Sequence, residues 1–80
     1  MHRVYAISSE TRNYIYVGMT TNLERRLNDH NKGYNKTTRA YSPFVLIHTE
    51  EFNTRQEARD REKELKSTKG KRFVKQMILK

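Results

Sequence analysis

Residues 14–30 read YIYVGMTTNLERRLNDH, and this stretch decides the fold that we predict. It opens with β-branched and aromatic residues typical of a strand, which we expect to end at Gly18 before a short polar turn. Residues 21–24, TNLE, have the spacing of a capping box and predict a helix over 21–32, with Gly33 at its end. A strand that leads into a capped helix is therefore the centre of the prediction.

The sequence before this stretch supplies a partner strand. Residues 3–8, RVYAIS, and 14–19, YIYVGM, are separated by a short polar segment, and this pattern predicts an antiparallel hairpin. If the strands pair symmetrically about that segment, Tyr5 lies opposite Tyr16 and both rings project from the same face.

The second half of the chain adds one strand and two helices. Residues 44–49, FVLIHT, predict a third strand, and their continuous apolar character indicates burial on both faces. A second capping box at residues 54–57, TRQE, opens a helix that ends near Lys66. Four apolar residues at helical spacing predict a terminal helix that covers one face of the sheet: Phe73, Val74, Met77 and Ile78.

We therefore predict the α/β (α+β) class. The architecture is a three-stranded antiparallel sheet flanked by three helices, in the order β-β-α-β-α-α. A chain of 80 residues is expected to form a single domain over residues 1–80, and its functional site is expected to be a surface cleft.

The charge of the chain predicts its partner. Seventeen Lys and Arg residues exceed nine Asp and Glu residues, which gives a net charge of +8. Such a surface attracts polyanions, and DNA is the first partner to consider. The chain has no cysteine, no apolar run long enough to span a membrane and no apolar signal-peptide centre. We expect a cytoplasmic monomer without membrane contact or a small-molecule cofactor.

Positive charges, hydroxyls and aromatic rings are mixed in the polar segment 34–43, YNKTTRAYSP, which is predicted to be a loop. That composition suits contact with a nucleic-acid backbone. The segment includes Tyr34, Lys36, Thr37, Thr38, Arg39 and Tyr41. The residues that we expect to bind nucleic acid are Arg25, Lys32, Lys36 and Arg39.

Polar side chains also stand where packing alone would place apolar ones. On the predicted helix 21–32, Arg26 and His30 share a stripe with two leucines, and on the helix after residue 54 Glu62 lies between Ala58 and Leu65. Hydrolysis of a phosphodiester needs a cation for the charge on the phosphoryl oxygens and a route for the proton of the attacking water. It usually needs a divalent metal as well.

Arg26 can supply the cation, and Glu62 can hold Mg²⁺. The proton route falls to Tyr5, Tyr16 or His30. Each group also has an ordinary explanation. The tyrosines would be a packed cross-strand pair, Arg26 and Glu62 would form a structural ion pair, and His30 would interact favourably with the helix dipole.

The ordered set of motifs resembles the GIY-YIG endonuclease superfamily from Arg3 to about Phe73. The first motif is represented by the tyrosine of RVYAI, the second by residues 16–18, YVG, and the family helix by NLERRLNDH. The metal-binding glutamate stands in EARDREKELK. In the first motif only the tyrosine carries over, because Gly and Ile are replaced. The chain is similar to the small stand-alone bacterial members.

The resemblance implies a metal-dependent endonuclease that acts on DNA in repair or recombination. It implies one divalent ion, Mg²⁺ or Mn²⁺, held by Glu62, and Arg26 as the group that stabilises the transition state. Tyr16 or Tyr5 would orient or deprotonate the water, with His30 on the proton route. The alternative is a non-catalytic nucleic-acid-binding module that keeps the nuclease scaffold.

Overall fold

The computed structural model describes the backbone of residues 1–78 and the side chains of residues 1–76. The elements are β1 (His2–Ser9), β2 (Ile15–Thr20), α1 (Leu23–Asn31), the short 3₁₀ helix η1 (Arg39–Tyr41), β3 (Phe44–Phe52), α2 (Arg55–Lys66) and α3 (Thr68–Ile78). Both strand pairs are antiparallel and the sheet order is β2-β1-β3. The predicted fold class and element order are confirmed, and η1 is an addition inside the predicted loop.

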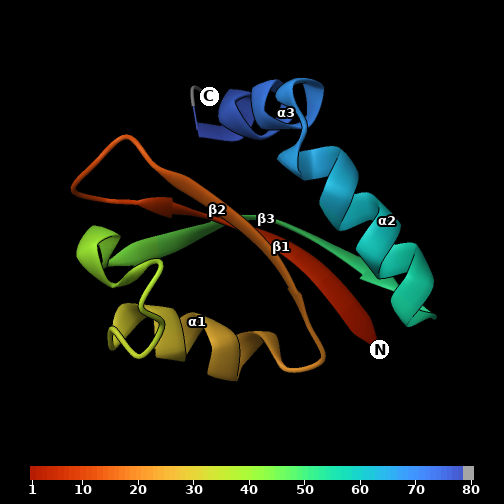
Figure 1. The fold of residues 1–80 in the computed structure, drawn as a ribbon, viewed down its shortest axis with the longest axis horizontal. Coiled ribbons are helices and arrows are strands. Elements are labelled where there is room, and N and C mark those ends of the chain that lie inside the picture. Colours follow the sequence, from red (N-terminus) through yellow and green to blue (C-terminus); the bar gives the residue numbers. More distant parts are fainter. Residues whose placement is uncertain (79–80) are drawn as a thin grey trace.

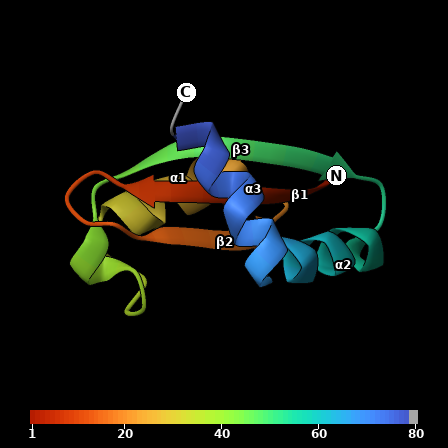
Figure 2. The same ribbon diagram turned by 90° about the horizontal axis from the view of Figure 1, so that it is seen from above.

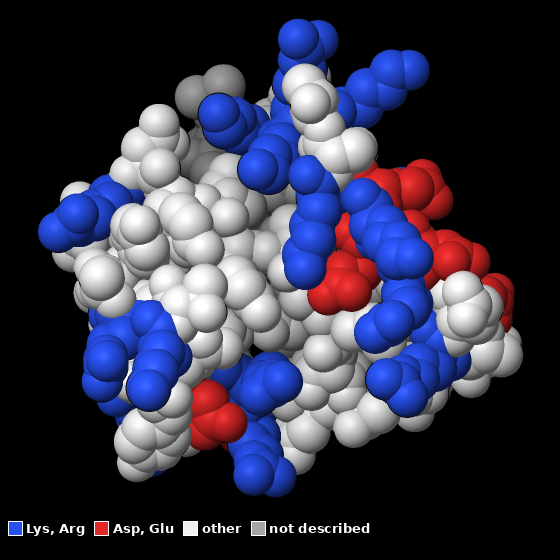
Figure 3. All heavy atoms as spheres, viewed as in Figure 1, with Lys and Arg blue, Asp and Glu red and all other residues white. Residues whose placement is uncertain are grey.

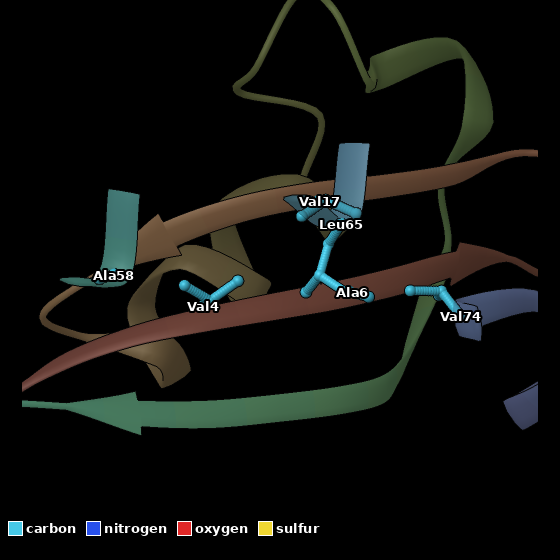
Figure 4. Packing of buried hydrophobic residues seen from close by; sticks show 6 residues of the cluster. All are labelled: Val4, Ala6, Val17, Ala58, Leu65 and Val74. Atoms are coloured by element: carbon cyan, nitrogen blue, oxygen red, sulfur yellow. The ribbon is translucent and has the colours of Figure 1, made fainter. Parts of the chain in front are cut away.

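The sheet separates two layers of helices. Helix α1 lies on one face, and α2 and α3 lie on the other, with α3 crossing over the strands (Figures 1 and 2). Alternate residues of β1 point to opposite faces. On the α2–α3 face they join an aliphatic cluster, shown in Figure 4, of Val4, Ala6, Val17, Ala58, Leu65 and Val74. On the α1 face the buried cluster is formed by Tyr5, Ile7 and Phe44.

The register of the hairpin differs from the symmetric pairing that we predicted. Tyr5 pairs with Gly18, and Tyr16 pairs with Ile7. The shift arises because Ser9 still belongs to β1, where its amide donates to the carbonyl of Tyr14 at 2.9 Å. A shift of two residues keeps the side-chain parity, so the two tyrosines still share one face, but diagonally.

The prediction that the third strand is buried on both faces is wrong. β3 is an edge strand, and Val45 and Leu46 are 43% and 39% exposed. β1 takes the central position because it pairs with both other strands. A continuous apolar run was therefore a poor guide to burial in so small a sheet.

Helix ends follow their caps. α1 starts at Leu23, two residues after Thr21, because Asn22 is the cap and its side chain accepts from the Arg25 amide at 3.1 Å. Gly33 follows the helix with a positive φ of 79°. In α2 the Thr54 hydroxyl accepts from the Glu57 amide at 3.2 Å, as the capping box predicts.

Helix α3 packs closely on α2. A Cβ at Gly70 would lie 2.1 Å from the Glu64 carbonyl oxygen, so only glycine permits this approach. Val74 is buried as predicted, whereas Phe73 is 37% exposed. The predicted packing of Met77 and Ile78 lies outside the described side chains. Over residues 1–78, the helices lack the length and apolar character of a membrane span.

Candidate active site

Gly18 brings the first tyrosine across β2. It lies inside this strand and not at its end, where the sequence had placed it. A Cβ at this position would lie 2.7 Å from the Tyr5 hydroxyl oxygen and 2.8 Å from its Cζ. The missing side chain therefore makes room for the Tyr5 ring, which reaches over the strand towards the open edge of the sheet.

A buried hydrogen-bonded chain runs from β1 to the loop before η1. The Tyr5 hydroxyl lies 3.0 Å from His30 Nε2, and His30 Nδ1 lies 2.8 Å from the Thr38 hydroxyl. These residues are 1%, 1% and 0% exposed. Burial, followed by the charge of Arg26, lowers the pKa of His30, so the imidazole is neutral near pH 7. One ring nitrogen then donates and the other accepts.

The sequence prediction missed the role of Thr38. We had assigned it to a loop surface that contacts nucleic acid, and the structure instead buries it against His30. Similarly, Tyr41 of that loop stacks on Tyr14, with ring centroids 3.9 Å apart. A contact between a helix and the loop that follows leaves no periodic pattern in the sequence, so no local signal marks Thr38.

The charge of Arg26 acts on both Tyr5 and His30. Burial and then the neighbouring Tyr16 raise the pKa of Tyr5, while the charge of Arg26 lowers it and that of Glu62 raises it. The Tyr16 ring lies 6.3 Å from the Tyr5 ring and 4.8 Å from the His30 ring, centroid to centroid. The structure therefore gathers aromatic groups from β1, β2 and α1.

Arg26 lies on the solvent side of this group. The predicted inward stripe of α1 holds only in part: Leu23 and Leu27 are half-buried and His30 is buried, but Arg26 is exposed. Arg26 lines an open hollow of about 240 Å³. The other lining residues are Thr20, Thr21, Asn22, Arg25 and Asp29.

Glu62 approaches the same edge from the other side of the sheet. Its side chain is only 18% exposed and lines a hollow of about 420 Å³. The other lining residues are His2, Met19, Thr20, Thr21, Arg55 and Arg59. Thr20 and Thr21 line both hollows, which are therefore neighbours around the end of β2.

The predicted ion pair between Arg26 and Glu62 is not formed. Among the described side chains, the cation within ion-pair distance of Glu62 is Lys66, at 3.4 Å and one helical turn away. Arg26 and Glu62 instead lie on opposite sides of the Thr20–Thr21 segment. This leaves the guanidinium free to meet a ligand.

The four predicted nucleic-acid contacts separate into two groups. Arg25 lies beside Arg26 in the smaller hollow. Lys32, Lys36 and Arg39 are exposed along the segment that follows α1, and they line neither hollow. In Figure 3, Lys and Arg side chains surround the lower part of the molecule near α1 and also gather over α2 and α3, where acidic side chains lie among them.

His48, which the sequence marked as structural, lies in a network on the α2–α3 face. Its Nε2 is 2.6 Å from Glu50, and Arg61 donates to the same carboxylate at 3.0 Å. Burial alone would raise the pKa of Glu50, but hydrogen bonds from Arg61 and His48 outweigh it and lower that pKa. The ring of Phe73 packs on both His48 and Arg61. This network ties β3 to α2 and α3.

Glu62 is the carboxylate that lines the larger hollow, and Asp29 is the carboxylate that lines the smaller one. Among the described residues, no three Asp, Glu, His or Cys side chains gather as a metal cluster. Mg²⁺ nevertheless keeps several waters and is commonly bound through one or two carboxylates together with substrate phosphates. Glu62, half-buried and facing a hollow with the hydroxyl residues Thr20 and Thr21, fits that kind of donor set.

Fold, motifs and site geometry define the class of this protein. Residues 1–76 match the family described as the GIY-YIG catalytic domain, and the chain belongs to the GIY-YIG family. The resemblance inferred from the motifs is thereby confirmed.

Its relatives are UPF0213 proteins of archaea and bacteria. A UPF0213 protein of Natronomonas pharaonis is 43% identical over 67 residues, which cover 82% of this chain and 78% of that protein. A UPF0213 protein of Staphylococcus haemolyticus is 40% identical over 67 residues, which cover 82% of this chain and 80% of that protein.

The solution NMR structure of the UPF0213 protein from Bacillus halodurans has the same fold. It matches with a TM-score of 0.56 and 33% identity, covering 95% of this chain and 83% of that one.

Proposed function

We propose that this protein is a metal-dependent endonuclease that hydrolyses phosphodiester bonds of DNA. The observation that carries the proposal is that Tyr5, Tyr16 and His30 pack together on the α1 face, while Arg26 and Glu62 line two neighbouring hollows that share Thr20 and Thr21. The GIY-YIG catalytic domain match supports it, since the scaffold is that of a nuclease. Cleavage of this kind serves DNA repair or recombination, and the absence of cysteine fits action in the cytoplasm.

Arg26 is the group that we assign to the scissile phosphate. Its guanidinium is exposed at the mouth of the smaller hollow and has no ion-pair partner among the described side chains. Donors placed where negative charge develops lower the barrier to phosphoryl transfer. Arg25, next to it in the same hollow, adds attraction for the phosphate backbone.

The proton of the attacking water has a route through Tyr5 and His30. The Tyr5 hydroxyl lies 3.0 Å from His30 Nε2 and donates to it in this route, and the positive charge of Arg26 acts on the same phenol. The Tyr5 oxygen accepts the water proton as its own proton passes to Nε2. His30 Nδ1–H meanwhile donates to Thr38. The raised pKa of Tyr5 makes a standing phenolate costly, so this phenol acts as a relay.

Tyr16 and Glu62 complete the assignment. Tyr16 is the more exposed of the two phenols and packs on the His30 ring, where it orients the water or a phosphate oxygen. Glu62 would hold a Mg²⁺ or Mn²⁺ ion, and such an ion, when bound, stabilises negative charge on the leaving oxygen.

A non-catalytic DNA-binding module is the second candidate. It is favoured by the burial of Tyr5, which is 1% exposed, and by the lack of a cluster of three metal-ligating side chains among the described residues. The relatives reported above carry no enzyme name. Such a module would bind DNA through its basic face, and its function would not depend on the residues assigned to catalysis.

The two candidates separate in one assay. Linear, nicked and branched DNA are incubated with purified protein in Mg²⁺, Mn²⁺ or EDTA, and products are resolved on denaturing gels. We expect metal-dependent cleavage that falls by ~10²-fold or more in Arg26→Ala. Arg72→Ala is the control, because Arg72 is exposed on α3 and lines neither hollow. If the wild-type protein gave no metal-dependent product on any substrate, the binding module would be the correct reading.

A further inference from the structure

We propose that Arg55 and Arg59 of α2 form a second phosphate-binding site, on the Glu62 side of the β2 end. The site would hold a backbone phosphate of the DNA strand whose neighbouring phosphate lies at Arg26. The inference rests on the proposed function in one respect, that the ligand is DNA. The four residues expected from the sequence to bind nucleic acid all lie on α1 or in the segment that follows it, and none lies on α2.

Arg55 and Arg59 are among the basic residues that have no acidic partner in the described part of the chain, whereas three others are paired. Arg3 pairs with Glu51 at 2.9 Å, Arg61 with Glu50 at 3.0 Å, and Lys66 with Glu62 at 3.4 Å. Within the described residues, no carboxylate lies within ion-pair distance of Arg55 or Arg59. Both guanidinium groups are exposed and line the same hollow.

Their placement on the helix brings two positive charges close together. Arg55 and Arg59 are four residues apart, so two like charges face each other on adjacent turns. Arg55 is also the first residue of α2, where the helix dipole favours negative charge. A phosphate between them relieves both penalties, and planar guanidinium groups bind phosphate through paired hydrogen bonds.

The hollow places this pair next to the reacting groups. Arg55, Arg59 and Glu62 fall at i, i+4 and i+7, so the arginines and the carboxylate share one stripe of α2. The hollow of about 420 Å³ that they line also includes Thr20 and Thr21, which border the hollow of Arg25 and Arg26. A DNA strand that crosses the end of β2 therefore meets a pair of guanidinium groups on each side.

This arrangement predicts how the protein holds the DNA strand. Arg26 would contact the scissile phosphate from the α1 side, and the α2 pair would fix the adjacent phosphate from the other side. Glu62 repels phosphate directly, so the phosphate is expected at the Arg55–Arg59 end of the stripe. Two anchored phosphates align the bond between them for in-line attack.

The test is a binding measurement without cleavage. Affinity for a fluorescent 20-base-pair duplex is measured in EDTA over a series of NaCl concentrations, for the wild type and for Arg55→Gln/Arg59→Gln. We expect weaker binding by ~10-fold or more at low salt and a log-log salt slope shallower by roughly 1 to 2, since each phosphate contact contributes about 0.9. Each single variant is expected to bind the duplex more weakly than the wild type and more tightly than the double variant.

The matched control removes the same charge elsewhere. Lys63→Gln/Lys69→Gln neutralises two exposed lysines on α2 and α3 that line neither hollow. If this control changed affinity and salt slope as much as the arginine pair, the site would be overturned in favour of general attraction to a basic protein. Because EDTA stops cleavage, failure here leaves the endonuclease proposal standing. A wild type that binds through the pair without cleaving overturns the endonuclease alone.

Discussion

The two faces of the sheet are built from the same strand but in different ways. On the α2–α3 face, β1 contributes Val4 and Ala6 to an aliphatic cluster. On the α1 face it contributes Tyr5, whose hydroxyl begins a buried polar chain to His30 and Thr38. Burying polar groups costs free energy that their hydrogen bonds only offset. Aliphatic residues would have closed this face as well, so the polar chain points to a functional demand on one face.

The largest expected effect comes from breaking the aliphatic face. Leu65→Ala removes a side chain that is 1% exposed and packs between the sheet and α3, and it should lower the free energy of unfolding by ~2–5 kcal/mol. Urea denaturation followed by circular dichroism measures it. Leu46→Ala, at a position 39% exposed on β3, is the control and should cost less than about 1 kcal/mol. Equal losses in the two variants would contradict the described core.

On the other face, Gly18→Ala should displace the Tyr5 phenol. The new methyl group would lie 2.7 Å from the Tyr5 hydroxyl, so the ring must shift, at a cost of ~1–3 kcal/mol. In a Tyr5→Leu background, whose shorter side chain does not reach Gly18, the same change should cost much less. A double-mutant cycle from urea denaturation measures the difference. Additive costs in that cycle would mean that the ring does not lie over the glycine.

Thr38→Val tests the polar chain itself. Valine has nearly the same shape but leaves His30 Nδ1 without its partner, and we expect a loss of ~1–3 kcal/mol in the free energy of unfolding. Nitrogen chemical shifts of the His30 ring report its tautomer. They should change in Thr38→Val and stay as in wild type in Thr38→Ser, which keeps the hydroxyl. Unchanged shifts in the valine variant would exclude Thr38 as the group that orients the ring.

The smallest expected effect is a pH dependence that belongs to the α1 face. Burial lowers the pKa of His30 below its ordinary value of 6.5, so the unfolded chain binds a proton at higher pH than the folded protein. This contribution to stability is complete above pH 6.5 and is lost as pH falls towards the folded pKa. NMR titration should place the pKa of His30 below 6.5. A His30 pKa at or above 6.5 would contradict a buried neutral ring.

Local signals predicted most of the fold, and contacts between distant segments account for what was missed. The Thr54 cap and the Gly33 terminus were readable because each depends on a few adjacent residues. The hairpin register was not, since it depends on whether Ser9 belongs to the strand or to the loop. Apolar content placed β3 but gave the wrong burial, because burial depends on which strand takes the centre.

The same distinction applies to the candidate site. Helical spacing indicated that Glu62 turns towards the sheet, and the structure leaves it 18% exposed beside the end of β2. Spacing also placed Arg26 inward, but a long cationic side chain can leave the stripe for solvent, and this one does. Thr38 and the Arg55–Arg59 pair became visible only when the segments that surround them were in place.

The most direct test of the account is the Mn²⁺-dependent rate of DNA cleavage by Glu62→Gln measured beside Glu64→Gln. Both variants replace a carboxylate of α2 by an amide, but Glu64 is exposed and pairs with Arg61, away from both hollows. We predict that Glu62→Gln loses cleavage by ~10²-fold or more, in line with removal of a group that stabilises developing charge, while Glu64→Gln cleaves as the wild type does. Metal-dependent cleavage that survives Glu62→Gln undiminished would contradict the account.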